Sequence, residues 1–414
     1  MTPRPDIILI SLIRWDNPFS STGISLAREF SRQGRVFVID HPFSIKDILV
    51  HFNRREIRER MRPLVLGKGI FRQVEGFHDN LALVTPGITL PVNGLPPGKL
   101  FEKLRRFNDR RVWQAVRRIL KEFQVRDFLL VNAFDPAYLL HTPSDLKPLL
   151  RIYLSVDEIS HAPYMKRHGE ILEKRQMEAA DIVLATSSEL QSRLGKISPG
   201  VALLPNAADT ELFGTAANQD LPCPRELEGK PRPLILYTGN LDRSRVDFEL
   251  LRKIAAVHPD KTLVLVGPVE EKVRTEEGLD RFPNILLVGS RPLKDLPAYL
   301  RQAGCAVIPF LKNGFTRGIY PLKINEYLAA GKPVVSTSFS ADIRGFGAVA
   351  YLAEDHPDFL RQISIALDRD SPEKVAERIR VARSNSWSAR VDQFWQLVDR
   401  SQAGRGHAAQ LVLQ

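Results

Sequence analysis

The sequence has very few cysteines. Cys223 and Cys305 are the only two among 414 residues, too few for a disulfide framework, and no metal-ligand spacing surrounds either of them. Such usage suits a reducing compartment. No apolar run approaches the roughly 20 residues that a membrane span needs. The apolar run at residues 7–13 is short and is followed by Arg-Trp-Asp at 14–16, so it predicts a buried strand and not a signal peptide. We expect a cytoplasmic protein, with peripheral attachment to the inner face of a membrane as an alternative.

The sequence also lacks the common nucleotide-binding signatures. It contains neither GxGxxG nor a Walker A motif, which removes support from dinucleotide-binding and P-loop proteins. No pair of residues has metal-site spacing, and no recognisable nucleophile arrangement occurs. We therefore expect a site with no metal and no resident cofactor.

Positive charge is concentrated in one part of the chain. The net charge is +11, and residues 51–126 hold 17 Lys or Arg against 7 Asp or Glu. Such a window indicates an anionic partner. Nucleic acid is not expected, because no nucleic-acid-binding motif accompanies the charge. Residues 99–123 predict an amphipathic helix, and packing on a sheet with a solvated basic face is the preferred interpretation. Docking on an anionic membrane is the alternative.

Short β-branched runs alternate with helical stretches along the chain, which is typical of α/β folds with parallel sheets. We predict two Rossmann-like, doubly wound domains facing each other across a cleft, with the site between them, because ligands bind at the carboxyl ends of parallel strands. The predicted segments are 1–213 (first domain), 214–233 (linker), 234–386 (second domain) and 387–414 (a helix crossing back to the first domain, then a frayed tail).

The turn YTGNLDRSRVD, residues 237–247, joins a predicted strand to a helix. Gly239 ends the strand, where the lack of a Cβ lets a ligand approach the backbone. Arg243 and Arg245 follow close to a helix N-terminus, the usual place for a phosphate group. A plain turn with surface arginines explains the pattern equally well, so the residues alone leave both interpretations open.

The stretch YPLKINEYLAAGKPVVST, residues 320–337, predicts a helix, a tight turn and a buried strand. Pro321 suits the first helical position, and the free N–H groups after it, beginning at Leu322, favour an anion. Lys323 adds a positive charge, and Glu326 can accept hydrogen bonds from two neighbouring sugar hydroxyls. A diphosphate joined to a ribose would satisfy all three groups. An i, i+3 Lys–Glu pair is the alternative, and periodicity alone favours it.

Several ordered motifs resemble those of one enzyme family. They are YTGNLDRSRVDFELLRKIAAVHPDKTLVLVGP, NILLVGSRPLKDLPAYLRQAGCAVIPF and PLKINEYLAAGKPVVST, preceded by EAADIVLATSSEL and LPNAADTELF. Together they resemble retaining, family-four-like glycosyltransferases of the GT-B fold, and in particular the bacterial exopolysaccharide and teichuronic-acid transferases. The resemblance covers about residues 152–337 and fits the first strand more loosely, whereas residues 45–130 contain no motif that resembles a known family.

The resemblance implies that the second domain binds a nucleotide-diphosphate sugar. Glu326 matches the second glutamate of a pair spaced eight apart, which binds the ribose in such enzymes. The first glutamate usually contacts the donor sugar, and Gly318 stands in its place here. The identity of the donor sugar is therefore open.

The resemblance also assigns the diphosphate and the base. Gly239 and the basic group near Arg245 match the diphosphate side, with Asn240 in place of the usual arginine. Ser290 and Arg291 match the position at which the edge of the base meets the backbone.

Catalysis in such enzymes needs neither a metal nor an obligatory protein nucleophile, because cations and helix N–H groups stabilise the leaving diphosphate. Asp157 follows a predicted strand and could orient or deprotonate the acceptor hydroxyl, with His161 as a second candidate. A helix cap is the alternative for Asp157. The end of the first strand predicts an acceptor side formed by Asp16, Ser21, Thr22 and Gly23.

The predicted function is transfer of a hexose from a nucleotide-diphosphate sugar to a glycan, a lipid-linked molecule or a small molecule, with retention. One alternative is a non-catalytic sugar-nucleotide-binding or assembly protein, which the residues Gly318 and Asn240 would fit. A sugar-nucleotide epimerase on the same scaffold is another. It would need more acids and bases than Asp157 and His161 provide.

Overall fold

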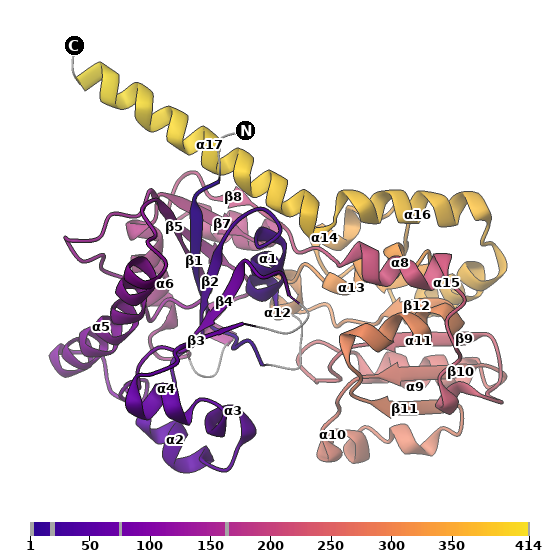
Figure 1. The fold of residues 1–414 in the computed structure, drawn as a ribbon. Helices are drawn as coiled ribbons and strands as arrows, with labels where there is room; N and C mark the ends of the chain where they lie inside the picture. The colour runs from indigo at the N-terminus through magenta and orange to yellow at the C-terminus, as the bar shows by residue number, and fades with distance from the viewer. Residues whose placement is uncertain (1–3, 17–20, 74–76, 162–164, 413–414) are drawn as a thin grey trace. The chain divides into compact units, whose positions relative to one another are not determined.

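The computed structural model describes residues 4–16, 21–73, 77–161 and 165–412 (Figure 1). The chain divides into two compact units. Residues 1–186, 190–204 and 391–414 form the first unit, and residues 187–189 and 205–390 form the second. Each unit is built on its own sheet with parallel strands, as the alternating sequence pattern predicts.

The first sheet has eight strands within the described residues, in the order β3-β4-β2-β1-β5-β6-β7-β8. Neighbouring strands are parallel, except that β3 pairs antiparallel with β4. The central strands are almost entirely buried, because helices cover both faces of such a sheet. The strands are β1 (Asp6–Ser11), β2 (Val36–Ile39), β3 (Phe71–Gln73), β4 (Leu81–Val84), β5 (Phe128–Ala133), β6 (Leu150–Ser155), β7 (Ile182–Ala185) and β8 (Ala202–Leu203).

Helices connect and cover these strands. They are α1 (Thr22–Phe30), α2 (Ile45–His51), α3 (Arg55–Arg58), α4 (Met61–Leu66), α5 (Lys99–Glu122), η1 (Ile159–His161), α6 (Gly169–Ala179) and α7 (Ser188–Gly195). The basic helix α5 packs through Phe101, Val112, Val116 and Ile119, as its periodicity predicts, whereas Phe107 is 43% exposed. The short strand β3 was not predicted, because three residues carry too little periodic signal.

The second sheet has six described strands, all parallel, in the order β11-β10-β9-β12-β13-β14. They are β9 (Leu234–Thr238), β10 (Thr262–Val266), β11 (Ile285–Gly289), β12 (Ala303–Ile308), β13 (Val334–Thr337) and β14 (Tyr351–Ala353). The associated helices are α8 (Thr210–Asn218), η2 (Arg225–Leu227), α9 (Phe248–Val257), α10 (Glu271–Glu276), η3 (Leu279–Arg281), η4 (Leu293–Asp295), α11 (Leu296–Gln302), α12 (Gly314–Arg317), α13 (Leu322–Ala329), α14 (Ala341–Arg344), α15 (His356–Asp368) and α16 (Pro372–Ser384). The last helix, α17 (Trp387–Val412), belongs to the first unit from residue 391 onward.

Two stretches differ in structure from their predicted form. The residues predicted as a linker, 214–233, lie within the second unit, and α8 extends into them because Phe213 and Ala216 are buried in that unit's core. Where a frayed tail was predicted, α17 remains helical to Val412. The tail contains several good helix formers, which local propensity favours over an irregular end.

The ends of β9 and β10 come very close together. The N–H group of Gly239 donates a hydrogen bond to the carbonyl oxygen of Val266 at 2.8 Å. A Cβ placed on Gly267 would come within 1.9 Å of the carbonyl oxygen of Gly239. The adjoining strand ends can therefore approach this closely only while residue 267 has no side chain.

Gly267→Ala is expected to lower the free energy of unfolding by about 1–3 kcal/mol, because the added methyl group meets backbone that no rotamer change can move. Gly214→Ala is the matched control. It lies inside α8, with its nearest neighbour for a Cβ at 3.9 Å, and should gain roughly 0.5–1 kcal/mol from helix propensity. Urea denaturation followed by circular dichroism measures both. Wild-type stability in Gly267→Ala would contradict the close approach.

Candidate functional site

The strongest candidate site lies at the carboxyl end of β9. Gly239 follows the strand with a φ of 134°, a conformation that other residues rarely adopt. A Cβ at Gly239 would come 2.2 Å from Cε and 2.6 Å from Nζ of Lys323. The Lys323 side chain is therefore packed directly against the backbone of the strand end.

Helix α13 is held in this position by Tyr327. The N–H group of Thr238, the last residue of β9, donates to the Tyr327 hydroxyl at 2.8 Å, and the Thr238 hydroxyl lies 3.1 Å from it. Because Tyr327 and Lys323 are four residues apart, they share one helical face. The hydrogen bond to β9 thus directs Lys323 towards Gly239.

The start of α13 is open. Pro321 is the N-cap residue and Leu322 the first helical residue, so the prediction of Pro321 inside the helix is wrong by one position. The reason lies in the backbone, since the ψ of Pro321 is 121°, outside the helical range. No side chain caps the helix, which leaves the first N–H groups without a capping partner.

Lys323 and Glu326 do not form the intrahelical ion pair that periodicity favours. Within the described residues, the ammonium group of Lys323 forms no hydrogen bond and no ion pair, and neither does the carboxylate of Glu326. The Lys323 ammonium faces the Tyr237 ring, 5.9 Å from its centroid. Glu326 is buried, with 8% of its surface exposed.

Burial affects the charge of both groups. It lowers the pKa of Lys323, with a further contribution from Arg245, although Glu326 and Asp242 act in the opposite direction. It raises the pKa of Glu326 more than Lys323 lowers it. A buried charge without a hydrogen-bonding partner is costly, so both groups would gain from a ligand that supplies an anion and hydroxyl groups.

Arg245 adds a second cation near this point. Its guanidinium lies 2.8 Å from Asp242 and 5.5 Å from the ring centroid of Phe315. Its positive charge contributes to the lowered pKa of Lys323, after burial. The backbone carbonyl of Asn240 accepts a hydrogen bond from the Tyr237 hydroxyl at 3.0 Å, which fixes the turn between them.

Two other predicted arginines are occupied elsewhere. Arg243 pairs with Glu276 at 2.6 Å and with Glu277 at 2.7 Å. Arg291, which follows the exposed Ser290 after β11, bonds to Glu226 and to the Tyr299 hydroxyl. The Tyr299 hydroxyl also donates to Glu226, and its hydrogen bond, together with the one from Arg291, lowers the pKa of Glu226 to about 2. Both guanidinium groups are therefore neutralised by glutamates of the protein itself.

Gly318 does not need to be glycine for backbone reasons. It is the C-cap of α12 with a φ of −80°, which any residue can adopt. A Cβ there would have its nearest neighbour, the carbonyl oxygen of Phe315, at an ordinary 3.6 Å. The missing carboxylate is thus not explained by the fold.

The remaining predicted residues belong to the first unit. Asp157 is exposed on the bend after β6, and His161 ends the short helix η1. Asp16 forms an ion pair with Arg60. Ser21 caps α1 by accepting a hydrogen bond from Ile24 N–H at 3.3 Å, and Thr22 is buried.

Gly23 also has a packing role in the first unit. A Cβ there would lie 3.0 Å from both Ser11 Oγ and Ala133 Cβ. The start of α1 can therefore rest on the carboxyl ends of β1 and β5. Ser21 and Gly23 consequently shape this edge of the sheet whether or not they touch an acceptor.

Sequence reasoning missed a buried polar group at the same edge of the first sheet. His41 Nδ1 lies 2.7 Å from Asp135, and these residues follow β2 and β5. Arg60 holds Asp40 through two nitrogen atoms, at 2.9 and 3.1 Å. The sequence does contain a signal for this pair. Asp40-His41 and Phe134-Asp135 each come directly after a strand, at the edge where ligands of parallel sheets bind.

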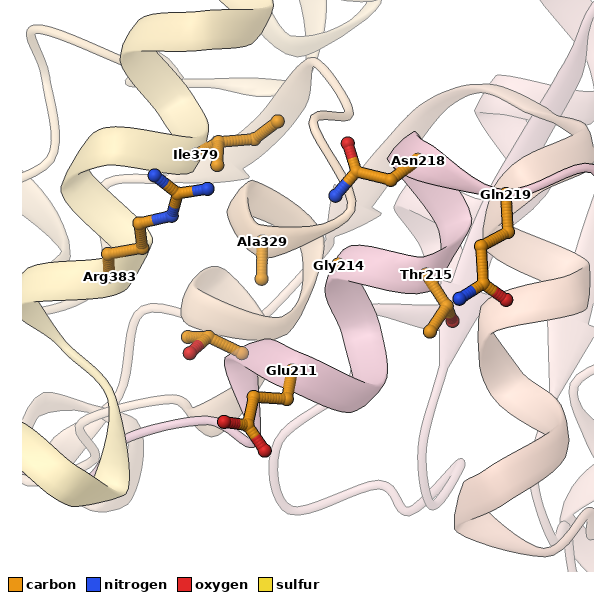
Figure 2. A pocket seen from close by; sticks show the side chains of 9 residues that line it. Glu211, Gly214, Thr215, Asn218, Gln219, Ala329, Ile379 and Arg383 are labelled. Carbon is orange, nitrogen blue, oxygen red and sulfur yellow. The ribbon is translucent and has the colours of Figure 1, made fainter.

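A separate pocket of about 250 Å³ lies between α8, α13 and α16 of the second unit (Figure 2). Figure 2 shows Glu211, Thr215 and Asn218 on α8 across from Ile379 and Arg383 on α16. The pocket is lined by Thr210, Glu211, Gly214, Thr215, Asn218, Gln219, Ala329, Ile379 and Arg383. It is thus a different place from the strand end at Gly239.

The burial of Glu326 predicts a pH-dependent stability. Since its folded pKa is raised above 4.5, its contribution to stability is complete below that pH and is lost as pH rises through the folded value. Glu326→Gln removes this loss. The variant should therefore gain thermal stability relative to wild type between pH 4 and pH 8.

Glu277→Gln is the matched control with the opposite sign, because hydrogen bonds from Arg252 and Arg243 leave the pKa of Glu277 lowered despite its partial burial. Its stability relative to wild type should fall over the same pH range. Parallel pH profiles for the two variants would contradict the assignment of Glu326 as a buried carboxyl without a partner.

Comparison with known proteins shows which proteins this chain is similar to. Residues 232–369 match the family model described as glycosyl transferases group 1. A protein of Bacillus subtilis (strain 168), provisionally named as the teichuronic acid biosynthesis glycosyltransferase TuaH, is 29% identical over 232 residues. That match covers 54% of this chain and 57% of the relative's length.

Solved structures share the fold over nearly the whole chain. The α,α-trehalose 6-phosphate synthase from Burkholderia multivorans superposes with a TM-score of 0.65 at 13% identity, covering 99% of this chain and 100% of that one. The sucrose-phosphate synthase from Thermosynechococcus elongatus gives a TM-score of 0.64 at 18% identity, covering 97% and 100%. The predicted GT-B fold with two doubly wound α/β units is confirmed. The chain is therefore similar to glycosyltransferases, and its residues 232–369 match the family of glycosyl transferases group 1.

Proposed function

We propose that this protein is a glycosyltransferase that moves a hexose from a nucleotide-diphosphate sugar to a glycan, a lipid-linked molecule or a small molecule, with retention at the anomeric carbon. The single observation that carries the proposal is the pair formed by the partly buried Lys323 beside the end of β9 and the buried Glu326 one turn further along α13, neither of which has a partner. The match of residues 232–369 to glycosyl transferases group 1 supports it. The chain spans 57% of its Bacillus relative, so the activity of the whole protein is part of the proposal.

The donor fits the groups at this strand end. The diphosphate would bind to Lys323, to Arg245 and to the uncapped N–H groups at Leu322, which together favour a dianion. Glu326 would accept hydrogen bonds from the two ribose hydroxyls, three residues further along α13. Among the proteins of the same fold, one from E. coli is bound with UDP-2-fluoro glucose and one from Burkholderia xenovorans is in complex with glucose-6-phosphate.

The reaction breaks the bond between the anomeric carbon and the diphosphate oxygen, and forms a bond from that carbon to the acceptor oxygen. Lys323 and Arg245 would stabilise the negative charge that develops on the leaving diphosphate. The acceptor hydroxyl proton would pass to the diphosphate or to Asp157, with His161 as an alternative base. In this proposal the transfer needs no resident metal or cofactor.

The first unit would serve the acceptor. Its candidate groups at the carboxyl edge of the sheet are Asp16 and Thr22, with the His41–Asp135 pair as an addition from the structure. We place the protein in the cytoplasm, peripheral to the inner face of the membrane, where a lipid-linked acceptor would be found. No described helix is both long and apolar enough to cross a bilayer.

A non-catalytic sugar-nucleotide-binding protein is the second candidate function. The specific observation in its favour is Gly318, which leaves no carboxylate at the position of the sugar-contacting glutamate although the backbone there would accept one. Nucleotide binding without turnover of any donor, measured over several donors and acceptors, would favour this candidate.

Glu326→Gln should weaken nucleotide binding by about 10- to 100-fold, because hydrogen bonds to a charged group contribute about 1.5–3 kcal/mol. Isothermal titration with UDP and other nucleoside diphosphates measures the affinity. Arg243→Gln is the matched control, since Arg243 is already neutralised by two glutamates, and it should bind as wild type does. Equal affinity for wild type and Glu326→Gln would refute the ribose assignment.

Gly318→Glu should fold normally, with an unchanged melting temperature, because the backbone and the space around it accept a side chain. If residue 318 faces the donor sugar, the added carboxylate should change the relative rates with different nucleotide hexoses by tenfold or more. Gly318→Gln controls for size without charge. A folded Gly318→Glu enzyme with the wild-type donor ranking would show that residue 318 does not read the sugar.

A further inference from the structure

Apolar side chains are exposed in an unusual concentration on three short helices of the first unit. Among the described residues, fourteen large apolar side chains are exposed, and seven of these fall within residues 45–66. They form what we call the α2–α4 patch: Ile45, Leu49, Val50, Phe52, Met61, Val65 and Leu66. Five of them are at least 59% exposed, namely Leu49, Val50, Phe52, Val65 and Leu66. Single exposed apolar residues need no explanation, but a concentration of them in one short stretch of chain indicates an interaction surface.

These helices are firmly held on their other side. Phe43, Ile57 and Leu64 are buried together in a small cluster, with Ile48 and Ile88 packed against it. Ser44 and Asp47 form a capping box at the start of α2, and Ile45 N–H donates to Thr89 at 2.9 Å. Figure 1 shows α2, α3 and α4 grouped outside the first sheet. The patch is therefore the outer face of an ordered substructure with its own core.

Cations surround the patch. Residues 45–68 contain seven Lys or Arg and three Asp or Glu, a net charge of +4. Within the described part of the chain, no ion pair involves the exposed Arg54, Arg58 or Arg62. Two of the three carboxylates are in use, since Asp47 caps α2 and Glu59 pairs with Arg55 and Arg72. The free positive charge thus lies next to the exposed apolar side chains.

We infer that the α2–α4 patch docks the protein on an anionic lipid bilayer. Apolar side chains on short helices can insert at the level of the headgroups, while neighbouring cations attract acidic lipid. A second copy of the chain would bring two surfaces of net charge +4 together, which like-charge repulsion disfavours. The basic helix α5 is a weaker candidate for insertion, because most of its apolar residues are buried inside the unit.

This inference deepens the proposed function, because a docked enzyme would meet a lipid-linked acceptor at the membrane surface. It does not depend on catalysis. Vesicle binding is measured without donor or acceptor, and nucleotide titration reports the donor site separately. Failure of one proposal can therefore be distinguished from failure of the other.

The test is co-sedimentation of the full chain with vesicles of phosphatidylcholine containing 30% phosphatidylglycerol, and with pure phosphatidylcholine, at roughly 0.1 M salt, where surface charge still acts. Wild type should bind the anionic vesicles at least tenfold more tightly. Leu49→Ser/Phe52→Ser/Leu66→Ser should reduce that binding at least tenfold. Arg54→Gln/Arg58→Gln/Arg62→Gln should reduce it about fivefold per residue, the equivalent of ~1 kcal/mol each.

Ile171→Ser/Ile197→Ser/Val257→Ser is the matched control, because these residues are similarly exposed but lie apart from the patch. It should bind as wild type does, and all variants should keep the wild-type melting temperature. No binding of wild type to anionic vesicles overturns the inference, as does equal binding by the patch variant. A concentration-dependent dimer that the patch variant abolishes, without vesicle binding, would assign the patch to self-association instead.

Discussion

The close approach of Lys323 to the backbone at Gly239 is the contact on which the second unit's site depends. It requires a residue without a Cβ at 239 and another at 267, where the ends of β9 and β10 come together. It also requires the hydrogen bonds that hold Tyr327 against Thr238. These contacts place a cation, an open helix start and a buried carboxylate at one strand end. A site for a diphosphate sugar then needs no special loop motif, which accounts for the missing glycine-rich signature.

The charged side chains fall into two groups, those that form ion pairs within the protein and those that have no such partner. Arg243 and Arg291 are each neutralised by glutamates, and Arg60 by Asp16 and Asp40. The partly buried Lys323 and the buried Glu326 have no such partners, an arrangement that lowers stability. Proteins tolerate local conflicts of this kind mainly at functional sites. The cost of the unpaired charges is therefore itself an argument for a ligand of matching charge.

The sequence predicted the fold well because the strands of both sheets are buried and apolar, which produces a clear periodic pattern. The resemblance assigned Gly239, Lys323 and Glu326 to one donor side, and the structure brings Lys323 against the backbone at Gly239. The role of this group in binding a donor stays a prediction. The sequence could not show which arginines were occupied, because Glu226, Glu276 and Glu277 are brought to them only by folding. The His41–Asp135 pair was missed for the same reason, since 94 residues separate its members.

The α2–α4 patch shows a further limit of sequence patterns. The stretch 45–66 has the composition of amphipathic helices, and each helix alone would be expected to bury its apolar face. In the structure the helices are too short to bury every apolar residue, so one set forms the cluster around Ile57 and Leu64 while the other faces solvent. Charge alone directed attention to the whole window 51–126, and in particular to α5. The exposed fractions of the side chains point instead to α2, α3 and α4, where exposed apolar side chains and unpaired cations occur together. This combination favours contact with a bilayer over a basic surface that is only solvated.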